Sequence, residues 1–339
     1  MPERLACIHT WLQGILGSNA YALEPASRDA SFRRYFRVQA SDGSYILMDA
    51  PPQREDCRPF VGVAQVLAGI GVHVPEILSA DVEQGLILLE DLGTEHYLDK
   101  LDAGNVDRLY GDACGALLSI QACAPTQGMA DYNRSLLQAE MNLFADWFLL
   151  THLRIQLTED EHRRLTDIVD LLCRSALEQP QVFVHRDYHS RNLMVDLHHN
   201  PGILDFQDAV RGPVTYDLVS LLRDVYVRWP VDAVVTWVGS YHDLALQHGI
   251  LEEVDLATFL RWFDLMGVQR HLKVAGIFAR LYYCDGKPRY LKDILLTLDY
   301  LVECAARYPE LAPLKELFDG WALRERLAVR NAAVLDGAG

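Results

Sequence analysis

The sequence predicts an α+β protein with two lobes, a small one built on an antiparallel sheet and a larger, mainly helical one. Short runs in the first ninety residues alternate apolar and polar side chains, as half-buried strands do. From Gly93 onward the apolar residues recur with helical spacing, except between residues 182 and 206. We therefore expect a sheet-bearing lobe over residues 1–90 and a helical lobe over residues 91–339, because 339 residues suffice for two cores.

The first lobe is expected to begin with an amphipathic helix and to continue with two strand pairs separated by a second helix. Ile8, Leu12 and Ile15 share one face of the opening helix. Asp42-Gly43 is a strong signal for a β-hairpin between two alternating runs. The expected elements are a helix over 5–16, strands over 36–39 and 45–48, a helix over 57–68, and strands over 77–80 and 86–89.

The second lobe contains three long amphipathic runs before the strand-like stretch, over residues 106–120, 136–153 and 159–177. The stretch itself divides into a buried strand over 182–184 and a hairpin over 193–205 that turns at a Pro-Gly pair. After it the pattern is helical to the end, without an internal repeat or a low-complexity linker.

The composition excludes several classes of protein. A formal net charge of -16 argues against binding nucleic acid or an anionic membrane surface, both of which need a concentrated basic patch. No apolar run is long enough to span a bilayer, and the first residues lack the pattern of a secretory signal. The seven cysteines form no CxxC pair and indicate free thiols in a reducing compartment. We expect a cytoplasmic monomer.

The segment from His185 to Asn192, followed by Asp205-Phe206, carries the chemistry. Because the hairpin after Asn192 reverses direction, Asn192 at its entrance and Asp205 at its exit are expected side by side, with Asp187 on the loop just before. Oxygen ligands suit Mg²⁺, and a further carboxylate can accept the proton of an attacking hydroxyl. Together they indicate metal-assisted phosphoryl transfer to an alcohol, that is, a small-molecule kinase.

This pattern resembles the protein-kinase catalytic and metal-binding motifs. Gln207 stands where a glycine would complete D-F-G, and the chain runs directly into Tyr216-Asp217-Leu218 without an activation segment. That order is similar to the aminoglycoside-phosphotransferase and choline-kinase branch of the kinase-like fold. The resemblance spans nearly the whole chain, and it implies a bilobal protein-kinase-like fold that uses ATP and Mg²⁺. It implies the following roles: Asp187 as the base, Asn192 and Asp205 as metal ligands, and His185 and Asp217 as structural support of the loop.

One part of the kinase pattern is missing. The strand over 45–48 lacks the expected lysine, and the following helix lacks its glutamate partner near Phe60. Losing both members of a buried pair together is physically coherent. We expect Arg33 or Arg34 to hold the ATP phosphates instead, with a solvated hairpin face as the alternative. The missing lysine also leaves open a non-catalytic nucleotide-binding module.

Adenine recognition is expected at the boundary between the lobes. The backbone groups of Glu90 and Leu92 would present an acceptor and a donor to the base. Leu47, Leu88 and either Ile203 or Leu204 would be apolar walls, although a place in the sheet core explains these residues equally well.

The acceptor is suggested by a second resemblance. The arginine-rich segment before residue 37, the strand end at residues 48–52 and the segment 269–281 look like those of the anomeric N-acetylmuramate/N-acetylglucosamine kinases of bacterial cell-wall recycling. That resemblance implies phosphorylation of the C1 hydroxyl of an amino sugar. Another alcohol, such as an aminoglycoside, choline or a homoserine-like metabolite, remains an alternative.

Cationic residues near the C-terminal part of the chain favour a neutral or anionic sugar over a polycation. Arg270 and Lys273 are one helical turn apart, and Arg280 follows. The alternative for these three is a solvated helix surface. Asp224 is a further candidate contact to sugar hydroxyls, or else a partner of Arg223 or Arg228.

Overall fold

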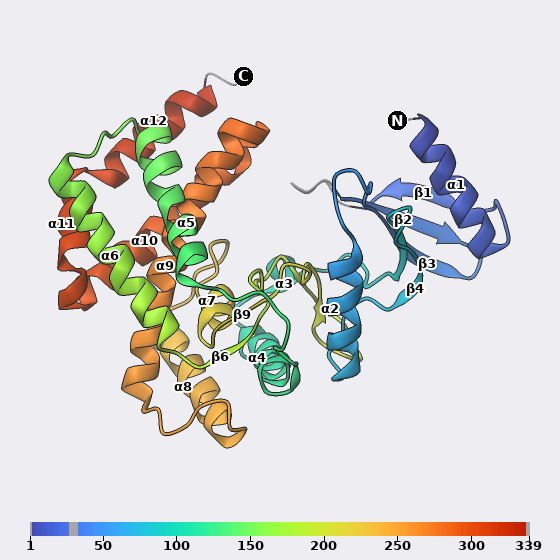
Figure 1. Cartoon of the computed structure of the whole chain (residues 1–339), viewed down its shortest axis with the longest axis horizontal. Coiled ribbons are helices and arrows are strands. Elements are labelled where there is room, and N and C mark those ends of the chain that lie inside the picture. Colours follow the sequence, from blue (N-terminus) through green and yellow to red (C-terminus); the bar gives the residue numbers. More distant parts are fainter. Residues whose placement is uncertain (1, 27–32, 337–339) are drawn as a thin grey trace. The chain divides into compact units, whose positions relative to one another are not determined.

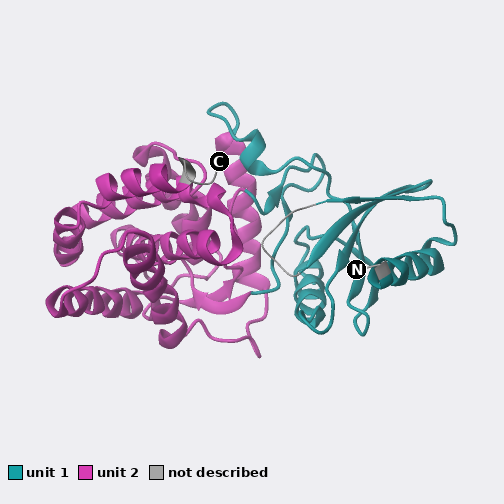
Figure 2. Cartoon of the chain, turned by 90° about the horizontal axis from the view of Figure 1, so that it is seen from above, with its two compact units in different colours: residues 1–105, 191–208 teal, residues 106–190, 209–339 magenta. Residues whose placement is uncertain are grey.

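The computed structural model describes residues 2–26 and 33–336. The chain forms two compact units (Figure 2). Unit 1 comprises Met1–Asn105 and Arg191–Asp208, and unit 2 comprises Val106–Ser190 and Ala209–Gly339. The predicted α+β class with a small antiparallel sheet and a mainly helical remainder is confirmed. The division into lobes at residue 90 stays a prediction.

Unit 1 is built on a five-stranded antiparallel sheet with the strand order β1-β2-β3-β5-β4 (Figure 1). The hairpin predicted at Asp42-Gly43 is present, with Ala40 paired to Gly43 and Arg34 paired to Asp49. The edge strand β1 was not predicted, because its four residues are mostly exposed and lack an alternating pattern. The strands are β1 (Ala22–Pro25), β2 (Arg34–Ala40), β3 (Gly43–Asp49), β4 (Ile77–Asp81) and β5 (Leu86–Glu90).

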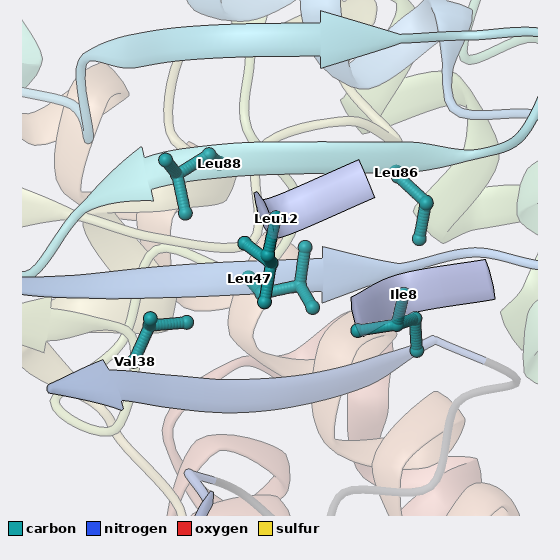
Figure 3. Packing of buried hydrophobic residues seen from close by; sticks show 6 residues of the cluster. All are labelled: Ile8, Leu12, Val38, Leu47, Leu86 and Leu88. Atoms are coloured by element: carbon teal, nitrogen blue, oxygen red, sulfur yellow. The ribbon is translucent and has the colours of Figure 1, made fainter. Parts of the chain in front are cut away.

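Helix α1 (Pro2–Leu16) covers one face of this sheet. Ile8 and Leu12 of the helix pack against four strand residues of the core cluster, Val38, Leu47, Leu86 and Leu88 (Figure 3). Ile15 was expected on the same face but is 38% exposed, because the buried stripe runs at intervals of four residues and reaches Leu16 instead. The second helix of the unit, α2 (Arg58–Gly69), buries Phe60, Ala64 and Leu67.

The segment 191–208 belongs to unit 1 although it is distant in sequence. Its strands β7 (Leu193–Met194) and β8 (Gly202–Ile203) pair antiparallel, as the sequence predicted. Backbone hydrogen bonds attach it on both sides: Ile203 N–H donates to His73 O at 2.8 Å, and Val195 N–H donates to Glu95 O at 2.8 Å.

Side chains complete this attachment. Asn200 donates to the hydroxyl of Tyr97, in α3 (Tyr97–Lys100), at 2.7 Å. The rings of Phe60 and Phe206 stack with centroids 4.9 Å apart. The hairpin that carries Asn192 and Asp205 is therefore held in place by the sheet-bearing unit.

Unit 2 is organised around α9 (Leu256–Asp285), which packs against most of the other helices of the unit. Asp255 caps its first turn by accepting from Thr258 N–H at 2.7 Å, and Gly286 ends it with a φ of 63°. The other helical elements are α4 (Val106–Cys123), α5 (Arg134–Leu143), the π-helix η1 (Phe144–His152), α6 (Glu159–Leu177), α7 (Tyr216–Leu222), α8 (Val231–Gln247), η2 (Pro288–Asp293), α10 (Ile294–Arg307), η3 (Pro309–Leu311), α11 (Ala312–Gly320) and α12 (Leu323–Asp336).

A two-stranded sheet in unit 2 precedes the segment from His185 to Asn192. The strand β6 (Gln181–Val184) pairs antiparallel with β9 (Val210–Pro213). β9 was not predicted, because Gly212-Pro213 is a signal for a turn and proline cannot donate to a ladder.

Among the described residues, no helix is both long and apolar enough to cross a membrane.

Candidate active site

The loop that follows β6 is held at its start by Asp217. This buried carboxylate, near the beginning of α7, accepts hydrogen bonds from the backbone amides of His185 at 2.6 Å and Arg186 at 3.0 Å. Burial raises the pKa of Asp217 to about 7, against the effect of the two amide donors, which lower it. Asp217 therefore holds the backbone at the start of the loop by hydrogen bonds.

Asp187, the expected base, is partly exposed in the same loop. Its backbone amide donates to Nδ1 of His185 at 3.2 Å, which leaves the proton of a neutral His185 on Nε2. Burial acts to raise the pKa of Asp187, but the positive charges of Lys273, His189 and Arg270 outweigh it and bring the pKa below its usual value. The carboxylate is thus ionised at neutral pH, as an acceptor of a proton must be.

Asp224 holds the far end of the loop. It accepts hydrogen bonds from the Ser190 amide at 2.9 Å and from the Ser190 hydroxyl, and its other oxygen accepts from the Tyr226 amide at 3.1 Å. The predicted alternative, a pair with Arg223 or Arg228, is not what the structure shows. Those two arginines instead pair with Asp264 and with Glu303 and Asp299, respectively. A contact of Asp224 with a sugar stays a prediction, and the present partners of this carboxylate are Ser190 of the loop and the Tyr226 amide.

Two non-glycine residues beside the predicted catalytic groups have a left-handed backbone. Arg186, next to Asp187, has a φ of 76°, and the metal-ligand candidate Asp205 has a φ of 64°. Such conformations cost about 1–3 kcal/mol each and gather at functional sites. This strain was not predicted from the sequence.

In unit 1, the structure brings Asn192 and Asp205 together. Asn192 Nδ2 lies 3.5 Å from Asp205 Oδ2, and the Leu204 amide donates to Asn192 O at 2.9 Å. Gln207 Nε2 donates to the other Asp205 oxygen at 2.8 Å. Asp187, by contrast, belongs to unit 2.

The donor set of this pair suits Mg²⁺. An amide oxygen and a carboxylate are hard ligands, and Mg²⁺ usually takes one or two such groups together with water and substrate phosphates. Among the described residues, no group of three or more His, Cys, Asp or Glu side chains could hold a metal ion.

Both candidate phosphate-binding arginines are engaged in ion pairs within unit 1. Arg33 Nη2 lies 2.6 Å from Glu55 Oε1, and Arg34 binds Asp49 through Nε and Nη2. The fully buried Asp49 also receives Arg4 from α1 at 2.7 Å. The solvated alternative does not describe Arg33, whose side chain is 8% exposed, whereas the Arg34 side chain is 37% exposed. Contact of either arginine with phosphate stays a prediction.

The backbone around Glu90 and Leu92 is fastened by a neighbouring ion pair. Arg37 binds both oxygens of Asp91, at 2.7 and 3.0 Å, and donates to Gly93 O at 2.9 Å. The Glu90 amide donates to Glu76 O at 2.9 Å.

Leu47 and Leu88, expected as walls for adenine, pack under α1 in the core cluster. Of the two explanations that the sequence left open for them, the structure shows the sheet core.

The cations of α9 are largely buried rather than part of a solvated helix surface. Arg270 and Lys273 are 2% and 6% exposed, and both lie over the ring of Tyr216, at 5.7 and 5.5 Å from its centroid. Arg280, farther along the helix, is exposed. The solvated alternative is therefore wrong for Arg270 and Lys273.

Sequence reasoning missed Glu140, which joins two cations in the interior of unit 2. Its Oε1 lies 3.0 Å from Lys273 Nζ and 2.5 Å from Arg186 Nη2, and its Oε2 accepts from the Tyr132 hydroxyl. A signal for it existed, because Glu140 falls on the buried stripe of α5 with Leu137 and Met141. A carboxylate at a core position indicates a buried cation nearby.

The fold and these residues define a phosphotransferase. Residues 22–252 match the model of a family described as "Phosphotransferase enzyme family". The chain is 53% identical over 295 residues to an N-acetylmuramate/N-acetylglucosamine kinase of Pseudomonas aeruginosa, an alignment that covers 87% of each chain. It is 47% identical to the protein of the same name in Pseudomonas putida, over 94% of this chain and 97% of that one. The chain therefore belongs to the phosphotransferase enzyme family, and it is a small-molecule kinase.

Solved structures with the same fold are much more distant in sequence. The aminoglycoside phosphotransferase APH(2'')-Ib with ADP bound is 14% identical, with a TM-score of 0.60 over 88% of this chain and 98% of that one. The choline kinase LicA from Streptococcus pneumoniae is 10% identical, with a TM-score of 0.61 over 87% of this chain and 99% of that one. The predicted resemblance to this branch of the kinase-like fold is confirmed.

Proposed function

We propose that this protein transfers the γ-phosphoryl group of ATP to the C1 hydroxyl of N-acetylmuramate and N-acetylglucosamine. The observation that carries this proposal is the 47% identity over 94% of the chain to a kinase named for these two sugars. Such an enzyme would act in the cytoplasm on sugars recovered from peptidoglycan.

Asp187 is the proposed base. It accepts the proton of the C1 hydroxyl while that oxygen forms a bond to the γ-phosphorus. The bond between the γ-phosphorus and the bridging oxygen breaks, and ADP leaves with the electron pair. Two features support this role, the ionised state of Asp187 and the hydrogen bonds by which Asp217 and Asp224 hold the loop on either side of it.

Asn192 and Asp205 are the proposed metal ligands. Mg²⁺ bound there supplies charge neutralisation for the phosphate oxygens. The amide and carboxylate oxygens of the pair suit this ion. We further propose that the backbone of Glu90 and Leu92 binds adenine and that Arg33 or Arg34 contacts the phosphates. Because Arg33 and Arg34 are already paired with Glu55 and Asp49, a phosphate contact requires that each pair be shared or exchanged.

The test is a panel of acceptors with ATP and Mg²⁺, measured by ADP release and by loss of the reducing end. Both amino sugars should release ADP and lose their reducing end, because phosphate on C1 blocks ring opening. ADP release with an aminoglycoside, choline or homoserine but with neither amino sugar would refute the proposed substrates. Nucleotide binding without consumption of any acceptor would favour the non-catalytic alternative.

A further inference from the structure

Arg270 is a buried cation without a carboxylate partner of its own. Its side chain lies in the interior of unit 2, where it stacks over Tyr216. It forms no ion pair with any residue that the structure describes, and its buried Nε has no hydrogen-bond partner among them. A guanidinium taken out of water is costly, and Asp187 and Asp224 offset that cost electrostatically without forming an ion pair with Arg270. A buried cation that no carboxylate pairs with directly favours an anionic ligand.

The two neighbouring cations differ from Arg270 in this respect. Lys273 lies 3.0 Å from Glu140 and donates to the Tyr216 hydroxyl at 2.9 Å. Arg186 is bound to the same glutamate. Lys273 and Arg186 are therefore committed to a structural network, whereas the charge of Arg270 is not neutralised in this way.

The surroundings of Arg270 indicate where its ligand would lie. The guanidinium acts electrostatically on Asp187 and on Asp224, the base and a residue that holds its loop. Its stacking partner, Tyr216, precedes Asp217, which binds the start of the same loop. An anion bound to Arg270 would thus lie close to the acceptor hydroxyl.

Two anions could occupy such a position, the lactyl carboxylate of N-acetylmuramate and the phosphoryl group in transfer. N-acetylglucosamine has no carboxylate. A buried cation dedicated to the carboxylate would be left unpaired with that sugar, and a site of this kind rejects the analogue by about 10⁴–10⁵-fold. A kinase that accepts both sugars should instead use a buried cation for the group that both reactions share.

We propose that Arg270 binds the oxygens of the phosphoryl group as it moves from ATP to the sugar and that it holds the product's phosphate. This assignment rests on the proposed function and makes Arg270 a catalytic residue for both sugars rather than a determinant of sugar choice. A planar guanidinium suits it, because two N–H donors can bind two phosphate oxygens at once. Lys273 acts as a positioning residue through its hydrogen bond to the Tyr216 hydroxyl. Glu140 acts as one through its ion pair with Arg186.

The kinetic test compares Arg270→Gln with Arg270→Lys and with Arg261→Gln, an arginine of the same helix paired with Glu310 near the surface. Arg270→Gln should lower kcat about 10²–10³-fold with both sugars, with a change in the KM of either sugar of less than about threefold. Arg270→Lys should recover part of the rate. The acid limb of the pH profile should move to higher pH in Arg270→Gln, because a positive charge near Asp187 is lost. Arg261→Gln should match the unaltered protein.

A binding measurement separates the phosphate role from a general loss of structure. In Arg270→Gln the Kd of N-acetylglucosamine 1-phosphate should rise about 10–100-fold, while the Kd of N-acetylglucosamine stays within about threefold. If only N-acetylmuramate loses affinity or turnover, Arg270 serves the carboxylate and the inference is wrong. Equal weakening of sugar and sugar phosphate, or unchanged kinetics with both sugars, also overturns it. Failure of the unaltered protein to phosphorylate either sugar would instead refute the proposed function.

Discussion

At the scale of residues, three carboxylates in and around the loop that follows β6 differ in their surroundings. Asp217 and Asp224 accept backbone hydrogen bonds at the two ends of the loop, and Asp187 lies between them, partly exposed. Burial raises the pKa of Asp217, whereas nearby cations lower that of Asp187. The charge of each group therefore follows from its environment rather than from its residue type.

Substitution of the base tests this assignment directly. Asp187→Asn should lower kcat about 10²–10⁴-fold, because an amide cannot take the proton of the acceptor hydroxyl. The KM for ATP should change little. Steady-state kinetics with Asp243→Asn, a substitution of an exposed carboxylate, gives the matched control. Turnover of Asp187→Asn close to that of the unaltered protein would rule out the role of Asp187.

At the scale of elements, α9 packs closely against α5 at a glycine. At Gly276 the helix approaches the end of α5 so closely that a Cβ atom would lie 2.3 Å from the carbonyl carbon of Leu143. The neighbouring atom belongs to the backbone, so it cannot turn away as a flexible side chain could. The helix that carries Arg270 and Lys273 is thus held close to α5 at Gly276, three residues after Lys273 and six after Arg270.

Gly276→Ala should destabilise the protein by about 1–3 kcal/mol or more, because the two helices must move apart. Denaturant unfolding followed by circular dichroism measures this change. The matched control is Gly111→Ala in α4, where a Cβ atom would meet nothing within 4 Å. That control should be neutral or stabilising by up to about 1 kcal/mol, because alanine favours a helix over glycine. Equal stabilities of the two variants would contradict the close approach.

At the scale of the whole molecule, the division into units separates the candidate ligands of the metal from the candidate base. The sheet-bearing unit includes Asn192 and Asp205 through the inserted segment 191–208, and the helical unit includes Asp187. In the proposed function, the metal bound with the nucleotide is held by residues of the sheet-bearing unit. The base that acts on the sugar belongs to the helical unit. Binding of the nucleotide can therefore be tested without the sugar.

ATP with Mg²⁺ should raise the free energy of unfolding by about 2.7 kcal/mol when ATP is present at one hundred times its Kd. Thermal unfolding with ATP alone, and with Asp205→Asn in the presence of Mg²⁺, should show a smaller rise, because the phosphates then lack the bound ion. A rise that is the same with and without Mg²⁺ would show that the ion does not contribute to nucleotide binding.

The sequence by itself determined the features that depend on neighbours along the chain. The hairpin at Asp42-Gly43 and the pairing that places Asn192 beside Asp205 follow from local turn signals and strand periodicity, and the motif spacing was sufficient to recognise the family. The strands β1 and β9 could not be predicted, because their pairing depends on partner strands rather than on their own pattern.

Only the tertiary structure decided which charged residues are buried and which are neutralised by an ion pair. Whether Arg33 is solvated depends on Glu55, and whether Lys273 is neutralised depends on Glu140, more than one hundred residues away in the chain. The amino-acid type sets which charge is available, but burial and distant partners set its energy. For the same reason, the sequence identified Arg270 as a candidate cation, and the structure showed that it lies buried without an ion pair among the described residues.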